Sequence, residues 1–511
     1  MKKTLSIIIL FFAINLQCLA NETDTFNLAG VIENIINYQE KTEFISEIQL
    51  DSRENFLYAT KNLYNGNVVV AYLEFLKTID SLDKNFSLLM VAKKLYEYGF
   101  FSLGDRAISK ISGVDKMQSQ INELKEAYKP SYELNKDEET YLVKAYTSIY
   151  YNNSPEEVAF NLIKKNILLE NSDYANFIMA KSMFECRQYV QALIYVDKAI
   201  EKNNKNSNYK LFKAQTLFAH KKYKEALKYI EQNEKDISIF LSQDFKILKQ
   251  QILSNLSTDE MDKRFYQIYS YYLAGNYYKT IKETQNILNF IKNNPKILTL
   301  QAMAYLALGE FENAKKDFEL SYKINKKFDL TIMGMADCDF KNENYKEAYK
   351  KYKKLFKTNL KQEAILKAEI ALSNLEKQEK KIAKLNKQKQ LFENRTFFEY
   401  YTIANSLFDD SKLKKKYTAK ALSLNVLYIN TWDILLEEDY KDKKFDNLEK
   451  LVFMLSFLDL KNPEYYYYTA LALENKDFKK EAFYEVKKAI NINPDYKPAI
   501  DLMNKLQNEL I

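Results

Sequence analysis

The stretch "YLALGEFENAKKDFELS", residues 305–321, decides the fold of this chain. Gly309 and Phe311 stand between two apolar stretches with helical spacing, and Gly275 and Tyr277 occupy the same places 34 residues earlier. The same turn pattern appears again 34 residues later as "NENYK". A turn, an aromatic residue and a small residue at one fixed interval indicate a repeat architecture.

Eight units share this interval, in three separate blocks. They begin at residues 173, 207, 261, 295, 329, 395, 429 and 463. Each unit reads as two helices, with a small residue midway along the first and another near the start of the second. Two antiparallel helices approach closely only where small side chains face each other. Such a pair cannot bury its own apolar face, so the units must stack.

The repeat resembles the tetratricopeptide repeat (TPR), a 34-residue helix–turn–helix family, over roughly residues 52–496. Trp432 falls at position 4 of its unit, and Ala489 and Pro494 fall at positions 27 and 32, as the family favours. The resemblance implies an all-α fold, a right-handed α-solenoid of stacked helix–turn–helix repeats. Lys414 and Thr280 depart from the pattern, because they stand at position 20, where the family has alanine.

The predicted organisation follows from the repeat and from where it fails. We expect, in order, a signal peptide (1–20), an N-terminal helical segment (21–51), degenerate repeats (52–172), two repeats (173–240), an irregular joint (241–260), three repeats (261–362), a Lys-rich helical pair (363–394), three repeats (395–496) and a C-terminal capping helix (497–511).

The first twenty residues predict export. Lys2 and Lys3 precede the apolar run Leu5–Ile14, and Ala20 supplies a cleavage site, as in a bacterial secretory signal. A retained N-terminal anchor is one alternative. Lipidation of Cys18 is another, although its flanking residues match the lipoprotein pattern poorly. The predicted location is the periplasm or cell envelope.

Catalysis is not expected. The only histidine is His220, and Cys186 and Cys338 lie 152 residues apart, which argues against zinc sites and against Cys/His or Ser/His/Asp catalysis. The eight glycines are scattered and form no phosphate-binding loop. The densest acidic cluster, "LLEEDY" at 435–440, reads as a solvated helix face. No catalytic residue, cofactor or metal is predicted.

The remaining functional feature is a concave surface. In TPR arrays the first helices line a groove through positions 2, 5, 9, 12 and 13, and an aromatic and Met-rich groove suits a peptide or a partner helix. The alternative is that these side chains pack between neighbouring helices. Transferred to this chain, the resemblance gives as groove residues Tyr174, Phe177, Lys181, Phe184, Leu211, Gln215, Phe218, Phe265, Tyr269, Tyr272, Met303, Met333, Asp337 and Phe340. The predicted function is a non-catalytic scaffold or adaptor that mediates protein–protein interaction.

Charge supplies a second hypothesis. Residues 341–420 hold 21 Lys/Arg and 10 Asp/Glu, a net charge of +11, in a chain whose total is +7. The Lys-rich region 346–416 could dock on a membrane or an anionic wall polymer, although an ordinary solvated helix face in a Lys-rich protein is the simpler explanation. Lys without Arg is weak evidence for nucleic acid, which is not expected as a partner.

Overall fold

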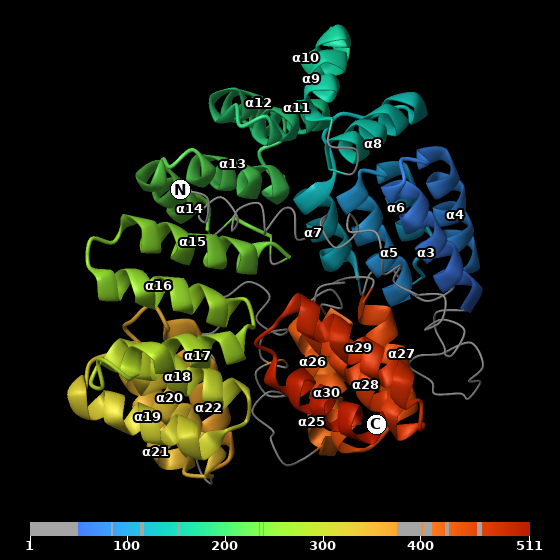
Figure 1. The fold of residues 1–511 in the computed structure, drawn as a ribbon. Helices are drawn as coiled ribbons and strands as arrows, with labels where there is room; N and C mark the ends of the chain where they lie inside the picture. The colour runs from blue at the N-terminus through green and yellow to red at the C-terminus, as the bar shows by residue number, and fades with distance from the viewer. Residues whose placement is uncertain are drawn as a thin grey trace. The chain divides into compact units, whose positions relative to one another are not determined.

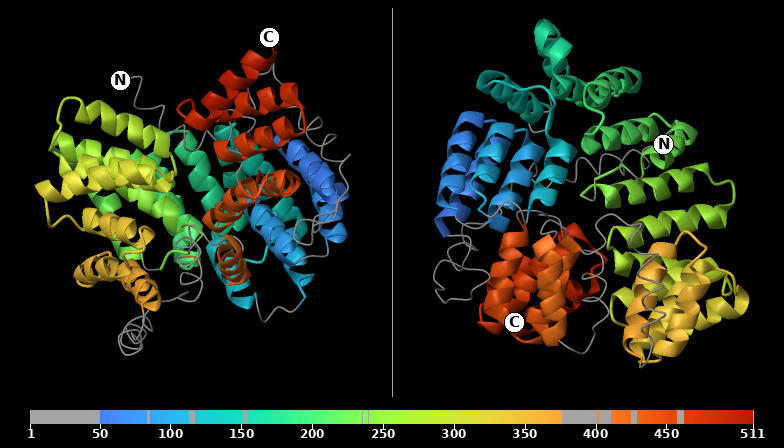
Figure 2. Two further views of the ribbon diagram at one scale, coloured as in Figure 1. Left: turned by 90° about the horizontal axis from the view of Figure 1, so that it is seen from below. Right: turned by 180° about the vertical axis from the view of Figure 1, so that it is seen from behind.

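The computed structural model describes residues 50–82, 85–112, 117–150, 154–234, 236–238, 240–375, 401, 411–424, 429–456 and 462–510. Within these ranges the secondary structure consists of helices and turns, with no strand. Consecutive helices pair as antiparallel hairpins, and neighbouring hairpins stack (Figure 1, Figure 2). The predicted all-α solenoid of stacked helix–turn–helix repeats is confirmed. The expected signal peptide, with Cys18, and most of the N-terminal segment lie outside the described residues.

The chain divides into two compact units, unit one up to Ile252 and unit two from Leu253. The helices of unit one are α3 (Leu50–Tyr64), α4 (Val68–Ser81), α5 (Asn85–Tyr98), α6 (Phe101–Ser109), α7 (Gln118–Tyr128), α8 (Lys136–Tyr150), α9 (Pro155–Lys164), α10 (Asn166–Asn171), α11 (Asp173–Glu185), α12 (Tyr189–Lys202), α13 (Ser207–Ala219) and α14 (Tyr223–Asn233).

Helix α15 (Ser242–Leu256) contains the boundary between the units. The helices of unit two are α16 (Glu260–Leu273), α17 (Tyr277–Leu288), α18 (Pro295–Ala307), α19 (Phe311–Ile324), α20 (Asp329–Lys341), α21 (Tyr345–Lys354), α22 (Lys361–Ser373), α25 (Ser411–Leu424), α26 (Ile429–Lys441), α27 (Phe445–Ser456), α28 (Pro463–Asn475), α29 (Lys479–Ile492) and α30 (Lys497–Leu510).

The turn between the two helices of a hairpin explains the most regular feature of the sequence. Nine of the described hairpins have a residue with positive φ there, Gly275 and Gly309 among them. In the turn that contains Gly309, the Gly309 N–H donates to the Leu306 carbonyl at 3.1 Å, and the Glu310 N–H donates to the Tyr305 carbonyl at 2.8 Å. This pair of bonds is a Schellman motif, which satisfies the last carbonyls of the first helix.

The small residues of the repeat lie where close packing was predicted. All of them are fully buried. Those of the first helices are Ala180, Ala214, Ala302, Ala336 and Ala470, and those of the second helices are Ala192, Ala226, Ala314 and Ala348. Thr280 takes the place of one such alanine and is equally buried, and its hydroxyl donates to the Asn276 carbonyl at 2.9 Å. The threonine therefore fits because its polar group is satisfied within its own helix.

Prolines stand at the starts of three helices. Pro155, Pro295 and Pro463 each occupy the first turn of a helix, where the missing N–H of proline costs little. The segment 241–260, expected as an irregular joint, instead contains the 15-residue helix α15. Its apolar residues Phe245, Leu248 and Ile252 recur at helical spacing and are buried, so packing forms the helix without a repeat signature.

Candidate functional site

The structure separates the fourteen predicted groove residues into two sets. Eight are buried: Tyr174, Phe177, Lys181, Phe184, Leu211, Phe265, Met333 and Phe340. Six are half-buried: Gln215, Phe218, Tyr269, Tyr272, Met303 and Asp337. The buried set serves helix packing, while contact with a peptide stays a prediction for the half-buried set.

Position 12 of the first helix has a structural role that the sequence did not reveal. Its aromatic ring packs on the turn aromatic at position 17 of the same hairpin, five residues later. The ring-centroid distances are 5.4 Å for Phe184–Tyr189, 5.5 Å for Phe218–Tyr223, 5.5 Å for Tyr272–Tyr277 and 5.1 Å for Phe340–Tyr345. The spacing between positions 12 and 17 was the available signal, since an aromatic pair recurs there in the units that begin at 173, 207, 261 and 329. These pairs stiffen the turn that joins the two helices.

Lys181 in unit one is enclosed by aromatic rings. Its Nζ lies 4.7 Å from the ring centroid of Phe177, 4.8 Å from Phe212, 5.3 Å from Tyr150 and 6.0 Å from Tyr146. It also donates a hydrogen bond to the Tyr150 hydroxyl at 3.0 Å. Cation–π attraction therefore stabilises a charge that burial disfavours.

Burial lowers the pKa of Lys181 to about 8, against a smaller opposite effect from the charge of Glu185. The unfolded chain then binds more protons than the folded chain between pH 8 and pH 10.5, so the cost of burying this lysine falls and the fold becomes more stable as the pH rises through that window. Below pH 8 the full cost of burying the charge applies.

We therefore expect Lys181→Met to raise the free energy of unfolding by about 1–3 kcal/mol at pH 7, because methionine fills the ring-lined space without a charge. The gain should shrink as the pH rises from 8 towards 10. Urea unfolding of both proteins across this pH range measures the gain. The titration of the buried tyrosines affects both proteins equally and so cancels in the difference between their free energies of unfolding. A gain that is the same at pH 7 and pH 10 would contradict the desolvated lysine.

In unit two the half-buried groove residues gather on the first helices of neighbouring hairpins. Tyr269 and Tyr272 lie on α16, Met303 on α18 and Asp337 on α20, and α18 contacts both other helices. The two tyrosine rings stack with centroids 6.1 Å apart. Burial, followed by the charges of Glu363 and Asp337 among others, raises the pKa of Tyr272, so its hydroxyl stays a neutral donor.

A charged network lies beside these tyrosines. Asp337 accepts hydrogen bonds from the Tyr352 hydroxyl at 2.7 Å and from Lys367 Nζ at 2.8 Å, and Lys367 also pairs with Glu363 at 2.8 Å. Burial lowers the pKa of Lys367, but the charges of Asp337 and Glu363 raise it by more, so the lysine remains charged. Sequence analysis missed Lys367 and Glu363, although their i,i+4 spacing on one helix was a readable signal.

We call Tyr269, Tyr272, Met303, Asp337, Glu363 and Lys367 the tyrosine–aspartate face. It offers aromatic and thioether surface for apolar side chains, tyrosine hydroxyls as donors, and the Glu363 carboxylate, whose side chain is 53% exposed. Peptide grooves combine these same elements.

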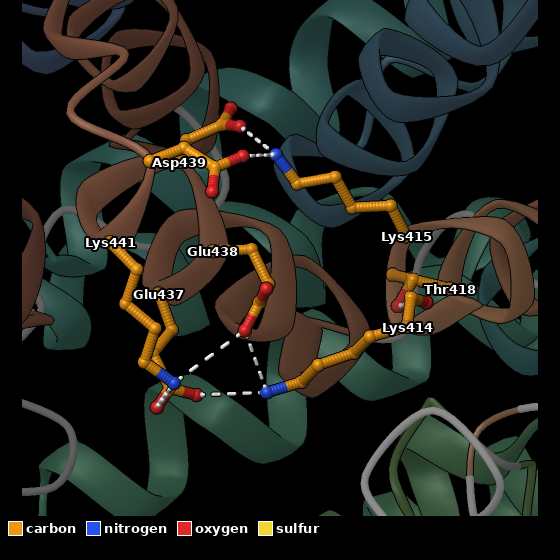
Figure 3. Close-up of polar contacts among 8 residues, drawn as sticks. Lys414, Lys415, Thr418, Glu437, Glu438, Asp439 and Lys441 are labelled. Carbon is orange, nitrogen blue, oxygen red and sulfur yellow. Dashed lines mark hydrogen bonds and ion pairs between the residues drawn. The ribbon is translucent and has the colours of Figure 1, made fainter. Parts of the chain in front are cut away.

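The acidic cluster at 435–440 is tied up in ion pairs. Lys414 Nζ lies 3.0 Å from Glu438 and 3.5 Å from Glu437, and Lys415 Nζ lies 3.0 Å from Asp439 (Figure 3). Lys441 also pairs with Glu437, at 2.8 Å. The cluster therefore joins α26 to α25 and leaves few free carboxylates for chemistry.

Other kinds of site are not found in the part of the chain that the structure describes. Within it, no three His, Cys, Asp or Glu side chains are arranged to hold a metal ion. Cys186 and Cys338 are free thiols, and the His220 ring packs against Tyr189 at 5.9 Å. None of the described helices has both the length and the apolar content needed to cross a bilayer.

Comparison with known proteins gave structural similarities alone. No family model matches the chain, and no curated protein matches it. The APC/C hetero-tetramer Cut9–Hcn1 is 12% identical, with 94% of this chain and 99% of that chain covered and a TM-score of 0.29. YrrB, described as a TPR protein with an unusual peptide-binding site, is 16% identical over 43% of this chain and 96% of its own, with a TM-score of 0.22. A tetratricopeptide repeat protein from Parabacteroides merdae is 12% identical, with 59% of this chain and 98% of that chain covered and a TM-score of 0.27. Similarity at this level says nothing of what the chain binds.

Proposed function

We propose that this protein is a non-catalytic scaffold of the bacterial cell envelope that binds a segment of another protein on the tyrosine–aspartate face. The observation that carries the proposal is the clustering of partly accessible Tyr269, Tyr272 and Met303 on successive first helices. At the equivalent positions of unit one, Lys181 and Phe184 are buried, and Gln215 and Phe218 are half-buried. An extended or helical segment with apolar side chains, and a basic group near Glu363, suits this surface.

Site-specific photo-cross-linking tests the proposal. A photoreactive phenylalanine analogue replaces Tyr269 or Met303 in cells that make the full chain, and mass spectrometry identifies what is linked. The matched control is Tyr484, which is 64% exposed on α29. We expect one discrete protein from the first two positions and none from the third. The identified segment should then bind the purified double variant Tyr269→Ala/Met303→Ala at least about tenfold more weakly than the unmodified protein. A loss of this size is typical when interface hot-spot residues are removed.

The Lys-rich surface remains a second candidate. Lys346, Lys350 and Lys353 lie on one exposed face of α21 at i, i+4 and i+7 spacing. Of these, Lys350 pairs with Glu347 on the same helix at 2.6 Å. Lys351 pairs with Asp339, and Lys367, Lys414 and Lys415 are paired as described above. Much of the 346–416 region lies outside the described residues. If the photo-cross-links detect no protein, and binding to anionic vesicles or wall polymer falls steeply with salt, docking through this surface replaces the peptide-binding proposal.

A further inference from the structure

Helix α9 has an apolar face that no described helix covers. Val158, Ala159 and Leu162 are buried on its inner side, which packs against α8 and α11. On the outer side the side chains of Phe160 and Ile163 are 57% and 55% exposed. Helices α9 and α10 extend away from α11 at the edge of unit one (Figure 1, Figure 2). Isolated exposed apolar residues are ordinary, but two on one projecting helix face form a patch.

The charges that flank this patch have opposite signs at its two ends. Glu157 lies in the first turn of α9 and Lys164 in its last turn, and both are exposed. Seven residues make almost two helical turns, so these two side chains share one flank of the helix, with Phe160 between them. Lys164 Nζ lies 4.1 Å from the centroid of the Phe160 ring. Along the helix, this face therefore carries an acidic, an aromatic and a basic side chain in that order.

A face with this order is complementary to itself. We propose that α9 pairs with α9 of a second copy of this chain in an antiparallel, two-fold arrangement. A two-fold axis beside Phe160 brings the two phenylalanine rings together. The same axis places Glu157 of each copy opposite Lys164 of the other, which forms two equivalent ion pairs. Ile163, and Ile167 on α10, which is 75% exposed, extend the apolar contact.

A bilayer fits the same face less well. The exposed groups around it include the carboxylates Glu156, Glu157 and Glu170 as well as Lys164 and Lys165. Anionic lipid would repel the three carboxylates, whereas an antiparallel second copy pairs acid with base. One helix face buries less surface than the roughly 1,200–2,000 Å² of a stable interface, so the dimer should be weak and dependent on concentration.

Sedimentation equilibrium of the full chain tests the proposal. The concentrations run from about 5 to 200 μM, the range in which weak interfaces dissociate. We expect reversible dimerisation. Glu157→Lys and Lys164→Glu should each weaken it about tenfold, because each places two like-charged pairs at the interface. The double variant Glu157→Lys/Lys164→Glu should recover most of the affinity, since the complementarity is restored with the signs exchanged. Simple misfolding or loss of contact would not produce that recovery.

The control is Val190→Asp with Ile194→Asp on α12, whose side chains are 55% and 44% exposed and lie outside the proposed contact. It should dimerise like the unmodified protein, while Phe160→Asp should be monomeric with an unchanged circular dichroism spectrum. A protein that is monomeric throughout, or a dimer that ignores the charge exchange, overturns the proposal. A monomer that binds phosphatidylglycerol-containing vesicles more tightly after Glu157→Lys would assign this face to lipid instead.

Discussion

Replacing Lys414 with alanine is expected to lower the free energy of unfolding of unit two by about 3–5 kcal/mol. Lys414 stands at position 20 of its unit, where most other units have alanine, and its side chain is only 4% exposed. It reaches Glu438 on α26, which is 3% exposed, at 3.0 Å. Alanine would remove this cation from the buried Glu438 carboxylate, while the half-exposed Lys441 lies farther away, at 3.5 Å.

The sole tryptophan makes this measurement direct. Trp432 lies on α26, the helix of Glu438, and is 1% exposed, so its fluorescence reports unfolding of this hairpin in urea. Lys444→Met is the matched control, because Lys444 is half exposed and its partner Asp442 is one-third exposed, and exposed pairs contribute about 0–1 kcal/mol. Lys414→Met with Glu438→Met should be nearly neutral, since a buried pair can be replaced by apolar side chains. A loss below about 1 kcal/mol for Lys414→Ala would show that the buried pair does not hold the hairpin.

The second large effect is a gain. Five of the nine turn positions carry residues other than glycine at positive φ: Arg187, Lys221, Glu343, Lys443 and Asp477. The left-handed conformation costs a residue with a Cβ about 1–2 kcal/mol, and glycine avoids this cost. Part of the gain is lost because glycine also makes the unfolded chain more flexible. Exchanging all five for glycine should therefore stabilise the protein by about 4–5 kcal/mol in total, because distant sites add.

Thermal unfolding of the five-fold variant and of Arg187→Gly/Lys221→Gly alone measures this gain and divides it between the two units. Lys228→Gly, at an exposed position in the middle of α14, is the control with the opposite sign, a loss of about 1 kcal/mol. Gly275→Ala should cost a similar amount from the backbone alone, because an added Cβ there meets no atom within 4 Å. Equal effects of glycine in the turns and in α14 would rule out backbone conformation as the cause.

The repeat, its hairpins and their turns could be predicted from the sequence alone. Gly275, Gly309 and Glu343 align at one position because a Schellman turn requires a left-handed residue after every first helix. The buried alanines follow from the same local logic, since two helices joined by a short turn must approach each other closely. These requirements act within about 34 residues, so one chain displays them in every unit.

The accessibility of the predicted groove residues depends on tertiary packing. Lys181 and Tyr269 both stand at position 9 of their units, yet Lys181 is buried and Tyr269 is half-buried. Likewise, "LLEEDY" reads as a solvated face until Lys414, 24 residues before Glu438, neutralises it from α25. The physical reason is that burial and charge pairing depend on how neighbouring hairpins approach one another, and no local pattern in the sequence encodes that approach.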